Sequence, residues 1–260
     1  MVHIGIDPVM FKLGAFLLTW HGFFSFVAVM VAVILVTRWA RSEDIGGDTV
    51  YSTAIWVILG GIIGARTIHV IDRWDIYSAN PTEIFAIWQG GIALLGAILG
   101  GLIAGSIYAY INKYPIGKLA DLTAPALIIA QSIGRIGDLI NGEHVSKVTE
   151  FSWGFVYTHP DSLTNRVYGL QSTHPSVGYE IIWNMFVLGI IYFMKDRIKP
   201  DGMLFALYLA LYSFGRFFIT FLREDKTWIA GLQQAHIITI ILMAITIPIL
   251  VYKARVVIRD

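Results

Sequence analysis

Cysteine is absent from this 260-residue chain, and charge is scarce: 14% of the residues are charged, whereas 56% are hydrophobic. Without cysteine, the protein itself can form no disulfide, thiolate metal site or cysteine nucleophile. A soluble globular domain rarely combines so little charge with so much apolar sequence. The composition therefore predicts an all-α polytopic membrane protein whose spans are long apolar runs.

A concentrated basic patch is also lacking. The formal net charge is +1 and the basic residues are dispersed along the chain, so the sequence gives no indication of nucleic-acid binding. The first apolar run extends from near Leu13 to Thr37, and no basic segment precedes it. Such a run is too long for a signal peptide, and we expect it to stay in the mature protein.

Seven apolar runs are long enough to span a bilayer: 14–37, 51–71, 90–111, 119–140, 177–194, 203–222 and 232–252. The loops on one side carry ten basic residues: Arg38, Arg41, Lys113, Lys118, Lys195, Arg197, Lys199, Lys253, Arg255 and Arg259. The loops on the other side carry five: Lys12, Arg73, Lys147, Arg166 and Lys226. The positive-inside rule then predicts seven transmembrane helices, with the N-terminus outside and the C-terminus in the cytoplasm.

We expect one transmembrane domain over residues 1–260, with a small periplasmic or extracellular cap at about 143–176. Within the cap, the residues 153–157 alternate as a short strand does, and Pro160 ends it. A second outer segment, 72–89, is either an interfacial segment at headgroup level or a loop with aromatic anchors. Its aromatic residues are Trp74, Tyr77, Phe85 and Trp88. In the third run, glycines without any charge predict close helix packing.

Charge lies where the fourth run reaches its polar boundary, in the stretch GRIGDLINGE at 134–143. Ionisable groups at membrane depth are costly and therefore need a reason. On a helix Gln131, Arg135 and Asp138 share one face, and the last two are close enough to pair. One interpretation is a neutralised pair that fixes helix packing, with Gly134, Gly137 and Gly142 allowing close approach. The other is an anion site, because arginine presents a planar fork of donors that matches phosphate.

Other cations favour the anion site. Arg216, Thr220 and Arg223 share one helix face at the outer end of the sixth run, and Arg66 and His69 form an i, i+3 pair in the second run. With Arg135, up to four cations approach the outer leaflet from three helices. Such a cluster suits a phospholipid phosphate or a phosphate leaving group, where developing charge needs fixed donors.

Two further polar features each have two interpretations, and the other histidines suggest no site. His21 in the first run is either a hydrogen-bonding bridge between helices or a base, because histidine moves protons near neutral pH. The sequence His174-Pro175-Ser176, with Tyr179 and Glu180 following, opens the fifth run and also fits ordinary helix initiation. His3, His159 and His236 show no ligand spacing with one another. We predict no metal site.

These motifs resemble prolipoprotein diacylglyceryl transferase over most of the chain. The stretch at 134–143 is similar to the family's signature G-R-I-G-N-F-I-N-G-E. Trp20-His21-Gly22 stands where the family usually shows W-Y-G, and Gly64-Ala65-Arg66 matches G-[GA]-R. Asp121 and Pro125 precede the signature, and His174-Pro175-Ser176 with Tyr179-Glu180 corresponds to H-P-[ST]-x-L-Y-E. Residues 212–223 follow Y-G-x-x-R-F-x-x-E-x-x-R, and the family's seven-helix, N-outside topology agrees with the charge count.

The resemblance implies transfer of diacylglyceryl from phosphatidylglycerol to the lipobox cysteine of a prolipoprotein signal peptide, in a bacterial cell membrane and in contact with membrane lipids. A thioether forms, glycerol 1-phosphate leaves, and no cofactor takes part. Arg135, Arg216 and His21 are then the catalytic residues, with His21 as candidate base. The substrate-binding residues are Arg135, Asp138, Asn141, Gly142, Glu143, Arg223, Arg66 and His69.

The chain also departs from the family pattern. Leu95, which follows Ile92-Ala93-Leu94, stands where many members carry histidine. Asp138 replaces asparagine, Thr220 replaces glutamate, and His21 and His69 replace tyrosines. The arginines are kept, so the departures concern the general base rather than phosphate binding. Two alternatives stay open: a divergent member of the family, and a lipid- or anion-binding transporter without this chemistry.

Overall fold

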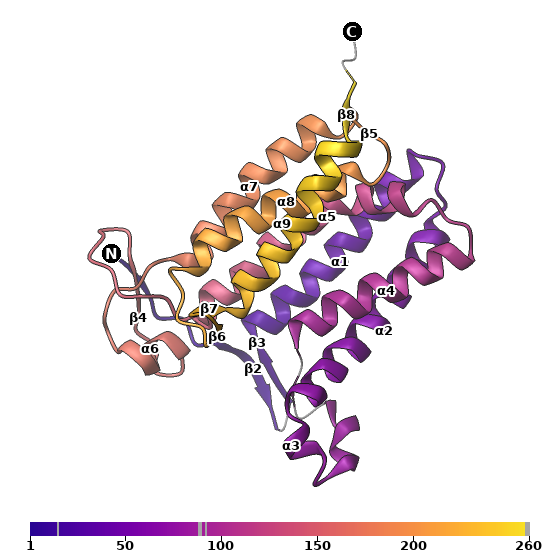
Figure 1. The fold of residues 1–260 in the computed structure, drawn as a ribbon. Coiled ribbons are helices and arrows are strands. Elements are labelled where there is room, and N and C mark those ends of the chain that lie inside the picture. Colours follow the sequence, from indigo (N-terminus) through magenta and orange to yellow (C-terminus); the bar gives the residue numbers. More distant parts are fainter. Residues whose placement is uncertain (15, 88–89, 92, 258–260) are drawn as a thin grey trace. The chain divides into compact units, whose positions relative to one another are not determined.

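The computed structural model describes residues 1–14, 16–87, 90–91 and 93–257. The aromatic Trp88, together with Ile92 and Arg259, lies outside the described residues. The protein is mostly helical (Figure 1). Its helices are α1 (Trp20–Arg41), α2 (Gly47–Asp72), α3 (Trp74–Tyr77), η1 (Pro81–Phe85), α4 (Leu94–Ile111), α5 (Ile116–Asn141), α6 (Leu163–Tyr168), α7 (Ser176–Met194), α8 (Met203–Thr220) and α9 (Gln234–Lys253). Residues Met1–Leu35 with Ala120–Asp260 form one compact unit and Val36–Leu119 a second, and each is described by itself.

Short strands pair two by two. The parallel pair joins β1 (Val2–Ile4) to β4 (Phe155–Tyr157). The antiparallel pairs are β2 (Val9–Leu13) with β3 (Phe16–Thr19), β5 (Ile198–Lys199) with β8 (Arg255–Val256), and β6 (Thr227–Ile229) with β7 (Leu232–Gln233). The strand predicted near 153–157 is confirmed as β4. The first helix begins at Trp20 rather than near residue 14, because 16–19 form β3.

Six of the described helices are long and apolar enough to cross a membrane: α1, α2, α5, α7, α8 and α9. They confirm a polytopic membrane protein. The third predicted run forms α4, an apolar helix that is shorter over its described side chains, Leu95–Ile111. Seven spans therefore stay a prediction, as does the cap, whose segment 143–176 contains β4 and α6.

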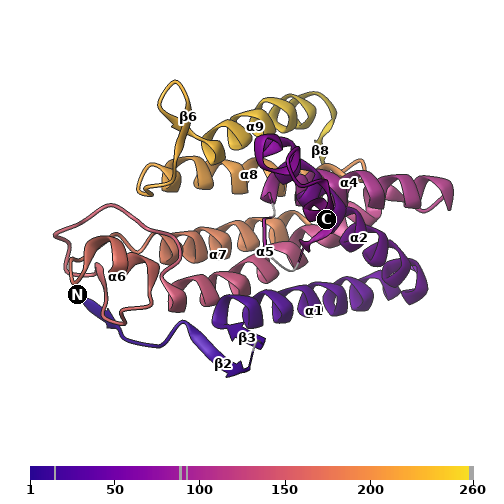
Figure 2. The same cartoon turned by 90° about the horizontal axis from the view of Figure 1, so that it is seen from below.

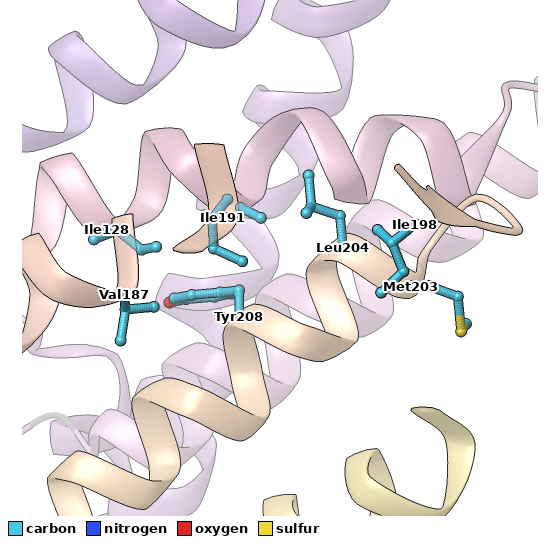
Figure 3. Close-up of a cluster of buried hydrophobic side chains, with 8 residues drawn as sticks. Ile128, Val187, Ile191, Ile198, Met203, Leu204 and Tyr208 are labelled. Atoms are coloured by element: carbon cyan, nitrogen blue, oxygen red, sulfur yellow. The ribbon is translucent and has the colours of Figure 1, made fainter. Parts of the chain in front are cut away.

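Within the larger unit, α7, α8 and α9 lie side by side (Figures 1 and 2). The apolar faces of α7 and α8 meet α5 in a buried cluster, and Ile249 and Leu250 of α9 pack against it. Seven of its members are labelled in Figure 3: Ile128, Val187, Ile191, Ile198, Met203, Leu204 and Tyr208. Burying a large apolar side chain contributes about 1.5–3 kcal/mol. This cluster thus fixes how the three helices face one another.

The same helix faces continue into the polar site. On α5 the face that carries Ile128 reaches Arg135 seven residues later, and on α7 Val187 is followed in the N-terminal direction by Glu180. On α8 the steps of four from Tyr208 lead to Arg216. Residues at these spacings share one side of a helix. Packing of the apolar ends therefore directs the charged ends of α5, α7 and α8 towards one another.

Asp121 of α5 ties the start of α8 to this arrangement. Its Oδ2 atom accepts a hydrogen bond from the amide of Gly202 at 2.8 Å, and its Oδ1 atom accepts one from the amide of Phe205 at 2.9 Å. The first amides of a helix have no partner inside the helix. Asp121 supplies these partners and so fixes the register of α8 against α5.

In the smaller unit, α2 and α4 pack through glycine. A Cβ atom added to Gly64 would lie 2.9 Å from the Cα atom of Gly100, and one added to Gly100 would lie 2.9 Å from the Cα atom of Gly64. Small residues at such spacing let transmembrane helices approach closely. The packing interpretation of the glycines in the third run is confirmed.

Candidate functional site

The polar end of α5 is the centre of the site. Arg135 and Asp138 stand at i and i+3, and Nη1 of the arginine lies 2.5 Å from Oδ2 of the aspartate. Asp138 is 3% exposed. A carboxylate this deeply buried requires charged or hydrogen-bonding partners, because desolvation of an isolated charge is costly. The predicted pairing of Arg135 with Asp138 is present.

His21 is the second partner of Asp138. The start of α1 packs directly on Gly137, where an added Cβ atom would meet the Cα atom of His21 at 2.7 Å. This close approach brings Nδ1 of His21 to 2.5 Å from Oδ1 of Asp138. An ionised carboxylate only accepts, so Nδ1 carries the hydrogen and Nε2 presents its lone pair. The imidazole is 46% exposed, so the side chain is accessible to a ligand.

Glu180 of α7 is a second buried carboxylate, and three arginines surround it. Its Oε2 atom lies 2.6 Å from Nε of Arg135, and its Oε1 atom forms an ion pair with Nη1 of Arg216. The same Oε1 accepts a longer hydrogen bond, 3.4 Å, from Nη1 of Arg223. Glu180 is 1% exposed. It therefore holds together arginines that come from the ends of α5 and α8.

His144, in the loop that follows α5, connects the two carboxylates. Nη2 of Arg223 lies 2.5 Å from its Nδ1 atom, and its Nε2 atom lies 3.2 Å from Oδ2 of Asp138. Arginine can only donate, and Nη1 of Arg135 also lies 3.0 Å from Nε2. Because a neutral imidazole accepts at one nitrogen only, the shorter contact from Arg223 makes Nδ1 the acceptor, and Nε2 carries the hydrogen that it donates to Asp138. Burial lowers the pKa of His144, and Arg223 and Arg135 lower it further, whereas its hydrogen bond to Asp138 opposes them. The imidazole is therefore neutral and both its nitrogens are occupied.

The contacts close into a ring of five residues, hereafter the arginine ring: Arg135, Asp138, His144, Arg223 and Glu180, with Arg216 attached at Glu180. Among the buried groups, three guanidiniums face two carboxylates, so the buried positive charges outnumber the buried negative charges by one. At the rim, the exposed Asp225 lies 3.0 Å from Nε of Arg223. An excess positive charge in buried surroundings favours an anion.

The rest of the signature borders the ring. Nδ2 of Asn141 donates to Oε1 of Glu143 at 2.6 Å, and the other oxygen of Glu143 lies 3.5 Å from Nδ1 of His21. Gly142 has a φ of +63°, and a Cβ atom there would lie 2.8 Å from the ring of Tyr157. Only glycine fits this turn without strain. The signature has three glycines that could allow close packing. Gly137 and Gly142 are packing positions, whereas a Cβ atom added to Gly134 would meet nothing within 4 Å.

Arg66 and His69 belong to the smaller unit. Arg66 donates to four backbone carbonyls, those of Glu83, Ile84, Gly90 and Gly91, at 2.5–2.9 Å. Its guanidinium also lies 5.0 Å from the centre of the Tyr77 ring, which packs edge-on against His69. These bonds occupy four of its five donor hydrogens. The guanidinium holds the chain between α3 and α4, and its binding of substrate stays a prediction.

Two groups of potential metal ligands occur among the described residues: Asp7, His159 and Asp161, and His21, Asp138 and Glu143. In the second group the hydrogen bond from His21 to Asp138 already accounts for the proximity. Asp138 also pairs with Arg135, whose charge opposes a second cation. The absence of a metal site stays a prediction.

Two departures from the family pattern have local explanations. Thr220 is fully buried, and its Oγ1 atom donates to the carbonyl of Arg216 at 2.6 Å, a contact that stays within α8. Leu95 lies near the start of α4, inside the smaller unit. Among the described residues of the larger unit, His21 and His144 are the imidazoles that contact Asp138.

Sequence reasoning did not assign a role to His144 and treated Glu180 as part of a helix start. A signal for Glu180 existed, because it is a carboxylate one turn inside an apolar run, where an ionisable group needs a partner. His144 directly follows the signature, but no spacing rule connects it with Arg223, 79 residues later. That contact depends on the tertiary fold.

Comparison with known proteins identifies the family. The profile named Prolipoprotein diacylglyceryl transferase matches residues 8–252. The chain belongs to the prolipoprotein diacylglyceryl transferase family. A relative named phosphatidylglycerol–prolipoprotein diacylglyceryl transferase from Dehalococcoides mccartyi is 36% identical over 256 residues, covering 98% of this chain and 96% of the relative. Relatives with the same name from Nostoc sp. and Listeria monocytogenes are 35% and 33% identical, covering 90% and 95% of this chain and 84% and 90% of their own.

Proposed function

We propose that this member of the prolipoprotein diacylglyceryl transferase family transfers diacylglyceryl from phosphatidylglycerol to the lipobox cysteine of a prolipoprotein. The observation that carries the proposal is the arginine ring with its excess positive charge, which suits the phosphate of an anionic phospholipid. Membership of the family and the activity for which its relatives are named support the same substrates. The enzyme is a multi-pass protein of the bacterial cell membrane.

The chemistry begins at the cysteine thiol of the acceptor. Its unperturbed pKa near 8.5 leaves it mainly protonated at neutral pH, so a base increases the fraction of thiolate. Nε2 of His21 takes the proton, and Asp138 holds the imidazole in the required tautomer and stabilises the cation that forms. His144 is unsuited to this role, because Arg223 and Asp138 occupy its two nitrogens.

The thiolate then attacks the glyceryl carbon that is esterified to phosphate. A carbon–sulfur bond forms while the carbon–oxygen bond breaks, and the electron pair leaves with the phosphate as glycerol 1-phosphate. Arg135 binds the lipid phosphate, and Arg216 stabilises the charge that develops on the leaving oxygen. Preorganised donors of this kind are worth roughly 10²–10³ in rate each. Arg223 supports Arg216 through Glu180.

The topology is part of the same proposal. The excess of basic residues in one set of loops supports a cytoplasmic C-terminus and an outside N-terminus, with seven spans when α4 is counted. The polar end of α5, and with it the arginine ring, then lies at the outer leaflet. The cap at 143–176 stands above the ring on that side.

Mass spectrometry of a lipobox peptide, incubated with the purified protein and phosphatidylglycerol, tests the function. We expect a diacylglyceryl mass increase on cysteine that Arg135→Ala abolishes. Arg197→Ala is the matched control, because Arg197 is exposed after the end of α7 and its guanidinium packs over the ring of Phe193, away from the arginine ring and from its partners. Substrate flux across proteoliposomes without any adduct would contradict a transferase and support a transporter.

A further inference from the structure

A cleft of about 690 Å³ adjoins the arginine ring. It lies between the β2–β3 hairpin, the end of α5 and the start of α6. The residues that line it include Phe11, Leu17, Asn141, Glu143, Leu163 and Arg166. The volume falls within the range of roughly 300–1,000 Å³ that ligand sites occupy. Asn141 and Glu143 belong to both the cleft and the rim of the ring.

Asn141 indicates that the cleft has a ligand. The residue is 2% exposed, its Nδ2 atom donates to Glu143, and its Oδ1 atom has no hydrogen-bond partner among the described residues. A buried polar atom without a partner costs free energy, and native proteins rarely leave one. Because Oδ1 can only accept, the missing partner is a donor such as a peptide N–H group.

The charges of the cleft exclude a second anionic lipid. Asp7, Glu143 and Asp161 contribute three negative charges, whereas Lys12 and Arg166 contribute two positive ones, for a sum of −1. Arg166 is already paired with Asp161 at 2.6 Å. A phosphate would thus be attracted to the arginine ring and repelled by the cleft, so the two sites differ in the substrate that they suit.

The walls suit an extended polypeptide. Phe11 and Leu17 from the hairpin and Leu163 from α6 are exposed apolar side chains that line the cleft. Within the described residues β2 pairs with β3 alone, so its other edge has free backbone donors and acceptors. An extended peptide can pair with such an edge through its main chain, which gives affinity without demanding one sequence.

We propose that this cleft binds the polypeptide substrate, in extended form along β2, with a backbone N–H group donating to Asn141 Oδ1. The inference rests on the proposed function and divides its two substrates between two sites, the lipid phosphate at the arginine ring and the peptide in the cleft. The acceptor cysteine then reaches the point where Glu143 and His21 meet, beside the base.

A matched pair of leucine variants tests the cleft. Leu163 lines it and is 45% exposed, whereas Leu170 lies outside it and is 69% exposed. We expect Leu163→Glu to raise KM for a lipobox peptide about tenfold, equivalent to about 1.4 kcal/mol, with KM for phosphatidylglycerol unchanged. Leu170→Glu should change neither constant. Equal peptide KM values for the two variants would overturn the proposal that the cleft binds the peptide.

Modified peptides test the main-chain contact without altering the protein. Lipobox peptides N-methylated at successive positions lose one donor each. Since alternate residues of a paired strand donate to its neighbour, we expect alternate methylations to raise KM and those between them to have no effect. If every methylated peptide keeps the wild-type KM, strand pairing is wrong. Because wild-type protein must first form the adduct, failure of the cleft is distinguished from failure of the transferase function.

Discussion

Nε of Arg135 lies 2.6 Å from Oε2 of Glu180, which joins α5 to α7 at a depth where neither charge is tolerated alone. Nη1 of the same guanidinium lies 2.5 Å from Asp138. One arginine thus bridges two buried carboxylates, and its orientation is fixed at both ends. A guanidinium held in this way needs no rearrangement when a phosphate arrives, which is the condition for effective electrostatic stabilisation.

Glu180→Gln removes the negative charge that three arginines share. Truncating one partner of a buried ion pair typically costs about 3–5 kcal/mol, so we expect thermal unfolding in detergent at a markedly lower temperature and loss of transfer. Glu150→Gln is the control, because Glu150 is exposed. Unchanged thermal stability in Glu180→Gln would show that the arginines do not depend on this carboxylate.

His21→Phe removes the proposed base. General base catalysis contributes roughly 10²–10⁴ in rate, and we expect kcat/KM to fall by an amount in that range at pH 7. The loss should shrink as the pH approaches about 8.5, where the free thiol ionises by itself. A rate deficit that stays constant from pH 6.5 to 8.5 argues instead for a structural role of the imidazole.

His144 makes stability depend on pH. Its pKa is lowered in the folded protein by burial, whereas an unfolded histidine titrates near 6.5. The unfolded chain therefore binds this proton more readily, so the contribution of neutral His144 is complete above about pH 6.5 and decreases as the pH falls.

The matched variant is His144→Gln, whose amide can accept from Arg223 and donate to Asp138 but does not titrate. The free energy of unfolding, measured by denaturation from pH 7.5 down to pH 5, should decrease less for this variant than for the wild type. If the two proteins lose stability in parallel, groups other than His144 dominate the dependence.

Arg66→Lys separates a structural from a ligand-binding role. A lysine cannot reproduce the four bonds to the carbonyls of 83, 84, 90 and 91, because its ammonium has three donors and no planar fork. We expect a lower unfolding temperature with KM for phosphatidylglycerol unchanged. A large rise in that KM, at wild-type stability, would support the sequence-based prediction that Arg66 binds substrate.

Much of the fold could be predicted because a bilayer imposes strong rules on sequence. All seven apolar runs became helices, and the strand in the cap was found from its alternation. The start of α1 was missed by six residues, since Phe16, Leu17 and Leu18 are as apolar in a hairpin as in a helix. Hydrophobic periodicity alone cannot distinguish a short apolar strand from a helical segment.

The site was predictable where charge is costly. Arg135, Asp138, Arg216 and Arg223 attract attention because they interrupt apolar sequence, and the structure brings them together. Their shared partner Glu180 and the bridging His144 come from other segments, so their contacts depend on how α5, α7 and α8 pack. Arg66 also interrupts apolar sequence, but backbone carbonyls between α3 and α4 accept its hydrogen bonds. The sequence alone does not show which arginine has such partners.

The central claim is that the arginine ring stabilises a departing phosphate, so the bond that breaks must be the carbon–oxygen bond. Phosphatidylglycerol labelled with ¹⁸O in the oxygen that bridges the diacylglyceryl carbon and phosphorus reports this directly. We predict that all the label appears in the released glycerol phosphate, in equal amount to the lipidated peptide. Label recovered in diacylglycerol, with phosphorus transferred to the peptide or to water, would contradict the account.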